Sequence, residues 1–208
     1  MTARTRPRAR RGEGSKLREL ILDAGERLLV QSGDADAVSI RAIAEAVGVT
    51  PPSIYLHFTD KDELIRAVSE RSFAAFDQFV EAAGAGVDDQ IESLRRRARA
   101  YVQFGLDNPE QYRIIFMGKG NVPAPVDVAS SAGRVAFQHL VGAVERAFAA
   151  GKLGEGLDPL LTATGLWAAM HGVTSLLISL PDFPWPDTDL LVGHVCESHL
   201  HGIAKERS

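Results

Sequence analysis

The chain has 208 residues, 45% of them hydrophobic and 24% charged, which is the composition of an ordinary soluble globular protein with one domain or two small ones. Its single cysteine, Cys196, excludes an intramolecular disulfide and suits a reducing cytosol. Apolar residues recur with helical spacing and strand-like alternation is scarce, so the sequence predicts an all-α fold.

The net charge of −4 is unevenly distributed. Residues 1–18 hold seven Lys and Arg side chains against Glu13 alone, so this segment has a net charge of +6 and the remainder −10. We assign residues 1–14 to a basic arm, which either lies along DNA or is only a solubilising tail. No uncharged apolar run follows the arginines, so we expect no secretory signal and a cytoplasmic location.

The segment after the arm predicts a helix over residues 15–31 and then two short helices within Ser39–Phe58. The first of this pair has apolar residues at positions i, i+3, i+4 and i+7, which form one helical face. Ser39 stands where an N-cap hydroxyl is favoured, and Gly48 stands where a left-handed residue commonly ends a helix.

The second short helix begins immediately after this glycine. Thr50 is its expected N-cap, and Pro51 and Pro52 fall in the first turn, where a missing N–H has no intrahelical partner to lose. Two helices joined by a short glycine-containing turn are typical of the helix-turn-helix motif, although such hairpins also occur in plain helical bundles.

The residues that follow, Tyr55-Leu56-His57-Phe58 and then Lys61, closely resemble the DNA-binding domain of the tetracycline-repressor (TetR) family. That family ends its recognition helix in a tyrosine, any residue, a histidine and an aromatic, and has a lysine at this spacing at the start of helix four. The match covers Lys16 to Leu64. It implies an N-terminal three-helix head (15–62, motif 39–58), which binds double-stranded operator DNA, and a C-terminal helical-bundle body (63–208), which binds a ligand and dimerises.

The resemblance also implies roles for single residues of the head. Phosphate contacts, which set register without reading sequence, are expected from Ser39, Tyr55, His57 and Lys61. Base contacts are expected from Arg41, Thr50, Pro51, Pro52 and Ser53, with Leu56 as a further candidate. Tyr55 and His57 can also be interpreted as core residues, and the prolines offer apolar contact alone.

Further helices are predicted along the rest of the chain. The first begins at Asp60, with Glu63 completing a capping box, and ends at the Gly84–Gly86 stretch. The others are expected at about 88–107, 109–117, 126–150, 160–180 and 187–204. On the last, the expected inward stripe is Leu190, Leu191, His194, Val195 and Ser198. A cluster of arginines on the second of these helices is interpreted as a solvated face rather than a second DNA contact: Arg95, Arg96, Arg97 and Arg99.

Residues 160–180 contain no Asp, Glu, Lys or Arg and are long enough to span a bilayer. Polar residues dilute the run, and we interpret it as a helix buried between the core and a partner subunit, with no membrane contact. Within it, Trp167-Ala168-Ala169-Met170-His171-Gly172 resembles the Trp-His-Gly (WHG) type of TetR-family C-terminal domain, and Asn108-Pro109 with Tyr112-Arg113 resembles the same type.

Aromatic and polar-aromatic residues recur on the helices of the body. As effector-binding candidates we select Tyr101, Phe104, Tyr112, Phe116, Phe137, Trp167, Met170 and His171. Apolar walls with a few polar atoms suit a ligand cavity, and the alternative is that these residues only fill the core. Trp167 and His171 are four residues apart and should share a helical face.

Metal and catalytic sites are not expected. Cys196 and His199 share a helical face, but His194 and His201 do not join them, and a zinc site needs three or four convergent ligands. No nucleophile, base and orienting group can be placed together, so we expect neither enzyme activity nor a cofactor.

These observations together predict a homodimeric, all-α transcriptional regulator, a repressor released from a pseudo-palindromic operator by a small, largely apolar effector. One alternative is a DNA-binding regulator whose body serves dimerisation only. Another is a helical enzyme or a membrane protein.

Overall fold

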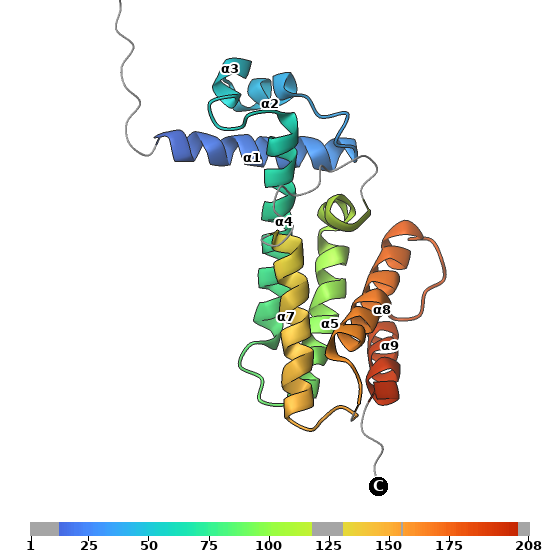
Figure 1. Ribbon diagram of the computed structural model, residues 1–208. Helices are drawn as coiled ribbons and strands as arrows, with labels where there is room; N and C mark the ends of the chain where they lie inside the picture. The colour runs from blue at the N-terminus through green and yellow to red at the C-terminus, as the bar shows by residue number, and fades with distance from the viewer. Residues whose placement is uncertain (1–12, 118–130, 155, 204–208) are drawn as a thin grey trace, which may run out of the picture. The chain divides into compact units, whose positions relative to one another are not determined.

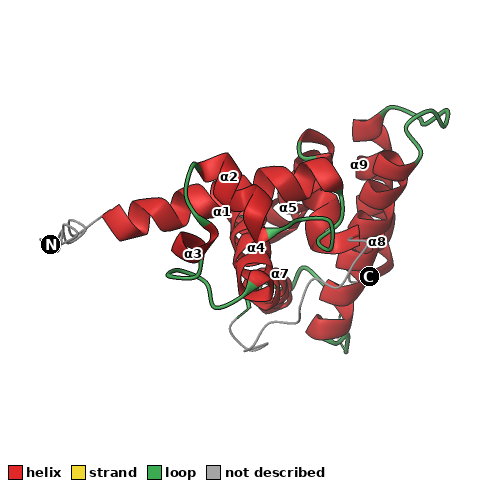
Figure 2. Cartoon of the chain, turned by 90° about the horizontal axis from the view of Figure 1, so that it is seen from above, coloured by secondary structure: helices red, strands yellow, loops and turns green. Residues whose placement is uncertain are grey.

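The computed structural model describes residues 13–117, 131–154 and 156–203, with side chains described from Gly14 to Leu200. These residues form helices joined by turns and loops, and none of them forms a strand (Figures 1 and 2). The all-α prediction is therefore confirmed. The chain divides into a head unit, Met1–Ser69 with Gly118–Ala124, and a body unit, Glu70–Met117 with Pro125–Ser208.

The head unit contains three helices before the long helix that leaves it. They are α1 (Glu13–Ser32), α2 (Ile40–Val47) and α3 (Pro51–Ile54). α2 packs on α1 and on α3. The core of this unit is formed by the fully buried Ile21, Ile43, Ile54, Phe58 and Leu64. The predicted helix boundaries agree to within two residues for α1 and α2, whereas α3 is a single turn that ends before the predicted Phe58.

Helix α4 (Lys61–Gly84) belongs to both units, because the boundary between them falls between Ser69 and Glu70, inside the helix. Its start follows the predicted capping pattern: Asp60 Oδ1 accepts a hydrogen bond from the Glu63 N–H at 2.7 Å. The Glu63 carboxylate reaches back to the N–H and hydroxyl of Thr59, and these bonds hold its pKa below the ordinary value.

The body unit is a helical bundle whose first part surrounds α5 (Gln90–Asp107). The chain turns at Asn108, continues as α6 (Pro109–Tyr112) and then opens into a π-helix, η1 (Arg113–Met117). A single α-helix was predicted for 109–117. π-Helical turns are rare and occur often at functional sites.

Three further helices complete the bundle: α7 (Ala132–Ala149), α8 (Pro159–Ser179) and α9 (Thr188–Ile203). α5 packs against each of them, and α8 packs against α7 and α9 (Figure 1). Gly105 makes the α5–α8 approach possible, since a Cβ there would lie 2.3 Å from Thr174 Cγ2. α7 begins at Ala132, with Ser131 as its N-cap, later than the predicted 126, and residues 126–130 lie outside the described part.

Two sequence interpretations of the body were wrong. The inward face of α9 is Val192, Cys196 and Leu200, flanked by the half-buried Leu191 and Val195, while Leu190, His194 and Ser198 are exposed. The helix is apolar on several faces, so the spacing of its apolar residues did not select one. Arg97, assigned to a solvated face, is only 6% exposed and forms an ion pair inside the body unit.

Candidate DNA interface and effector site

The turn between α2 and α3 has the geometry that its sequence predicts. Ser39 is extended, and its Oγ accepts a hydrogen bond from the Ala42 N–H at 3.1 Å. Gly48 adopts φ 77°, which residues with a side chain rarely tolerate, and its N–H is donated back to α2 carbonyls. These two residues fix where α2 ends and therefore where the chain enters α3.

Helix α3 exposes its candidate contact residues and buries its support. Thr50, Pro51 and Pro52 are exposed and Ser53 is half-buried. The Thr50 hydroxyl makes no capping bond and instead lies 3.1 Å from the Ser53 hydroxyl. Ile54 is fully buried, so the single turn is anchored from beneath while its outer face remains available.

The residues after α3 form a tightened turn, because the N–H groups of His57 and Phe58 both donate to the Ile54 carbonyl, at 2.9 and 3.1 Å. Phe58 is buried, whereas Tyr55 is 53% exposed and Leu56 82% exposed. The core interpretation of Tyr55 therefore does not fit its position. An exposed aromatic ring with a phenolic hydroxyl suits contact with a DNA backbone.

Three further candidates lie in the head unit. Arg41 is exposed on α2 and makes no hydrogen bond or ion pair to any described residue. His57 is half-buried, with Cε1 3.8 Å from where a Cβ on Gly14 would lie. Lys61 is at the first position of α4 and donates to the Asp36 carbonyl at 3.2 Å. The Arg41 side chain is therefore free to meet a phosphate or a base edge, whereas Lys61 would exchange its bond to the Asp36 carbonyl for a phosphate contact.

The body unit brings six of the eight effector candidates into one cluster, in which a hydrogen-bonded chain joins four of them to Ser175. Trp167 Nε1 donates to the Tyr101 hydroxyl at 3.2 Å, and the Tyr101 and Tyr112 hydroxyls are 3.0 Å apart. The Tyr112 hydroxyl lies 2.8 Å from His171 Nδ1, and His171 Nε2 lies 3.3 Å from Ser175 Oγ. We call these five residues, Tyr101, Tyr112, Trp167, His171 and Ser175, the polar hub.

All five members of the polar hub are satisfied together in one proton arrangement. In this arrangement His171 is the neutral tautomer with its proton on Nε2, so that Nδ1 accepts from the Tyr112 hydroxyl and Nε2–H donates to Ser175 Oγ. Burial raises the pKa of the Tyr101 and Tyr112 hydroxyls and lowers the pKa of the His171 imidazole. Each shift favours the neutral form, so the hub is uncharged near neutral pH.

Apolar rings surround the polar hub. Phe116, on η1, contacts Tyr112 at a ring-centroid distance of 4.8 Å and His171 at 5.6 Å, and Phe137 lies 5.7 Å from Trp167. Phe104 and Met170 lie apart from the hub contacts: Phe104 packs on Phe76, and Met170 is a buried core residue.

Sequence reasoning missed two participants in this region. Phe76 on α4 makes edge contacts with Tyr101, Phe104 and Phe116, and Ser175 caps the hub through His171. Ser175 could have been found, since it stands four residues after His171 and shares its helical face. Phe76 had no local signal that separated it from the other apolar residues of α4.

Helix α8 presents a second surface, opposite in character to the hub. Among the described helices it is the one long and apolar enough to cross a membrane by length and composition, and 33% of that stretch is buried within the chain. Several large apolar side chains remain exposed on α8, at its C-cap and at the start of α9: Leu160, Leu161, Leu176, Leu180 and Leu190. Exposed apolar side chains of this number are typical of an interaction surface.

The described residues contain no group of three or more His, Cys, Asp or Glu side chains that could hold a metal ion. Cys196 is buried on α9, and burial raises the pKa of its thiol. His201 lies outside the residues whose side chains are described.

A capped helix-turn-helix on a three-helix core, followed by a helical bundle, defines a helix-turn-helix transcription regulator. Residues 21–68 match the family described as bacterial regulatory proteins, tetR family, and residues 94–197 match the tetracyclin repressor-like C-terminal domain. The chain belongs to the TetR family of transcription regulators. The second match includes both segments, 108–113 and 167–172, that resemble the WHG type.

Solved structures share this fold over nearly the whole chain. A protein of unknown function from Rhodococcus sp. RHA1 has a TM-score of 0.78 and 27% identity, covering 91% of this chain and 96% of that one. NalD, the secondary repressor of the MexAB-OprM multidrug efflux pump in Pseudomonas aeruginosa, has a TM-score of 0.69 and 24% identity, covering 93% of this chain and 100% of that one. FadR from Bacillus subtilis, in complex with stearoyl-CoA, has a TM-score of 0.71 and 16% identity, covering 89% of this chain and 98% of that one.

Proposed function

We propose that this chain is a homodimeric repressor that binds a pseudo-palindromic operator through two copies of Ser39–Phe58 and is released by a small, largely apolar effector. The observation that supports it best is the outer face of α3 and the following turn, where Tyr55 and Leu56 are exposed above the buried Ile54 and Phe58. Exposed side chains on a rigid buried support are what groove recognition requires. A regulator of this kind acts on chromosomal DNA, so we place it in the cytoplasm.

A salt-dependent gel shift on the promoter DNA that flanks the gene should distinguish the proposed phosphate contacts from the proposed base contacts. Lys61→Ala and Tyr55→Ala should weaken binding to all sequences, and Lys61→Ala should reduce the slope of log affinity against log salt by about 1. Arg41→Ala should instead relax the preference at one base position by about 1–3 kcal/mol. Lys152→Ala, an exposed lysine of the body unit, is the matched control and should change neither quantity.

The basic arm, which lies outside the described residues, is tested in the same way. Deleting residues 1–12 removes five arginines, so affinity should fall and the salt slope should flatten further. An unchanged slope would identify the arm as a solubilising tail.

The exposed leucines of α8 and α9 support the dimer. A two-fold axis places the same patch on both subunits, so α8 and α9 can pack against their mates as a four-helix interface. Light scattering at micromolar concentration should report a dimer, and Leu176→Glu should shift it to monomer. Leu20→Glu, an equally exposed leucine of α1, should leave the dimer intact. A monomeric wild-type protein would remove the basis for a palindromic operator.

The polar hub supports an effector site, because uncharged polar groups within aromatic walls suit a largely apolar ligand with few hydrogen-bonding atoms. Trp167→Ala should abolish induction and leave operator binding without effector intact. The alternative, a body that serves dimerisation only, is favoured by the internal satisfaction of the hub. A normal inducer response by Trp167→Ala, or its unfolding, would mean that the hub residues only fill the core. The lack of any ligand-induced thermal shift in the wild type would support the dimerisation-only alternative.

A further inference from the structure

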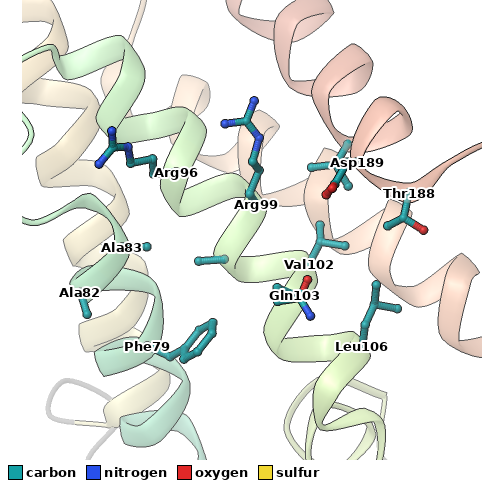
Figure 3. Close-up of a pocket in the computed structure, with 12 residues that line it drawn as sticks. Phe79, Ala82, Ala83, Arg96, Arg99, Val102, Gln103, Leu106, Thr188 and Asp189 are labelled. Atoms are coloured by element: carbon teal, nitrogen blue, oxygen red, sulfur yellow. The ribbon is translucent and has the colours of Figure 1, made fainter.

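A groove of about 510 Å³ lies on the body unit between the C-terminal part of α4, the middle of α5 and the start of α9 (Figure 3). It shares no residue with the eight effector candidates. The proposed regulator does not require it, and the groove needs its own explanation.

The α5 side of the groove is polar at one end and apolar at the other. Arg96, Arg99, Gln103 and Leu106 follow one another at intervals of three or four residues, so they lie along one face of the helix, in that order. Figure 3 shows the two guanidinium groups towards one end and Leu106 towards the other, with the Phe79 ring of α4 directed towards α5.

The two arginines of the groove leave most of their hydrogen-bond donors without a partner among the described residues. Arg96 donates through Nε to Glu92 at 3.1 Å. Arg99 is exposed and makes no hydrogen bond or ion pair with any described residue. Asp189 is the one carboxylate among the lining residues, so the charged lining retains an excess of positive charge. A guanidinium with its fork of donors unoccupied is suited to a carboxylate.

The other end lacks ionisable side chains and exposes apolar surface. Phe79 is 44% exposed although it is a large aromatic residue, and Val102, Val192 and two alanines of α4 complete the wall. The volume lies within the range of about 300–1,000 Å³ that is usual for small-molecule sites. An apolar wall next to an arginine without an ion-pair partner fits a ligand that has an apolar part and a negatively charged group.

We propose that this groove is a second ligand site, which binds a small amphipathic carboxylate: the carboxylate lies on Arg99 and Arg96, and the hydrocarbon part lies on Phe79 and Leu106. Helix α4 supplies one wall and begins at Lys61, a proposed DNA contact. The ligand can change operator affinity only if it binds the DNA-bound and free forms with different affinity.

The test uses octanoate and its uncharged analogue octan-1-ol, titrated into the full-length protein by isothermal titration calorimetry. Octanoate should bind once per chain. Octan-1-ol should bind at least about tenfold more weakly than octanoate, because a hydrogen-bonded charge pair is lost. Arg99→Gln should weaken octanoate by a similar factor and leave octan-1-ol unchanged. Ala82→Trp, which fills the groove from an exposed position on α4, should abolish binding of both.

Two variants separate this site from other surfaces. Arg146→Gln removes an exposed arginine of α7 outside the groove, and Trp167→Ala alters the polar hub, so both should bind octanoate like the wild type. The proposal is overturned if the wild type binds no octanoate, or if Arg99→Gln binds it unchanged. It is also overturned if Trp167→Ala loses octanoate while Arg99→Gln retains it, since the ligand then occupies the hub. Operator affinity, measured separately, decides the proposed function independently.

Discussion

The head unit and the body unit organise their candidate sites in opposite ways. In the head, the residues proposed to contact DNA are exposed or half-buried, and the residues that position them are buried beneath. In the body, Tyr101 and Tyr112 of the polar hub are buried while Trp167 is 37% exposed, and the polar atoms of the hub already bond to one another. An exposed site is complete before its ligand arrives, whereas an internal site must exchange existing contacts for ligand contacts, which links binding there to conformational change.

The largest expected effect tests the buried support of the head. Ile54→Ala removes a fully buried side chain and should lower the free energy of unfolding by about 3 kcal/mol, with loss of operator binding. Leu56→Ala, two residues away and 82% exposed, should change stability by less than about 0.5 kcal/mol. Urea unfolding followed by circular dichroism measures both. Equal losses for the two variants would contradict the division into support and contact surface.

The next effect concerns the body, where a glycine makes room for a buried charge. Arg97 donates to both Glu81 oxygens, at 2.9 and 3.0 Å, and to Ser93, and the pair holds the pKa of the Glu81 carboxyl below its ordinary value. A Cβ on Gly84 would lie 1.8 Å from Arg97 Nη1. Gly84→Ala should therefore displace the guanidinium and destabilise the body by about 2–3 kcal/mol, because it separates a largely buried ion pair.

The control for this prediction is Gly142→Ala on α7, where the nearest atom beyond ordinary helix neighbours is Arg146 Nη1 at 3.4 Å. Alanine in an unobstructed helix interior is favoured over glycine by up to about 1 kcal/mol, so this variant should be neutral or stabilised. Thermal melts of the two variants should move in opposite directions. A stabilised Gly84→Ala protein would show that Arg97 is not held in this position.

Local sequence predicted the head better than the body for a physical reason. Ser39, Gly48 and Asp60 act on backbone groups within four residues, so their roles follow from spacing alone. The partner of Arg97 is sixteen residues away, across the turn between α4 and α5, and neighbouring Asp89 and Glu92 suggested a solvated face.

The same distinction holds inside the body. Trp167 and His171 lie together as their i, i+4 spacing predicts. The hydrogen bonds that join them to Tyr101 and Tyr112 connect residues 59 to 70 positions apart. No periodicity specifies such pairings, and the sequence left the choice between a filled core and a cavity open.

A smaller effect separates the two caps of the helix-turn-helix. Ser39→Ala removes the hydrogen bond to the Ala42 N–H and should cost about 1 kcal/mol of stability. Thr50→Ala should cost at most a few tenths, because the Thr50 side chain caps no N–H and makes only an exposed contact with Ser53. Chemical denaturation of both variants, with the wild type as reference, measures the difference. A larger loss for Thr50→Ala would mean that its hydroxyl caps α3 in solution.

The smallest expected effect tests the neutral state of the polar hub. Burial holds the folded-state pKa of His171 below its ordinary value of 6.5, so the unfolded chain binds a proton that the folded chain does not. The contribution of this group to stability is therefore complete above pH 6.5 and is lost as the pH falls towards the folded-state pKa.

Urea midpoints between pH 8 and pH 5.5 should decrease for the wild type and decrease less for His171→Asn, which keeps an acceptor near Tyr112 and cannot titrate. His194→Asn, at an exposed position on α9, should follow the wild type. Parallel profiles for wild type and His171→Asn would mean that the imidazole is solvated, and the hub would then be open to water rather than closed as its hydrogen bonds indicate.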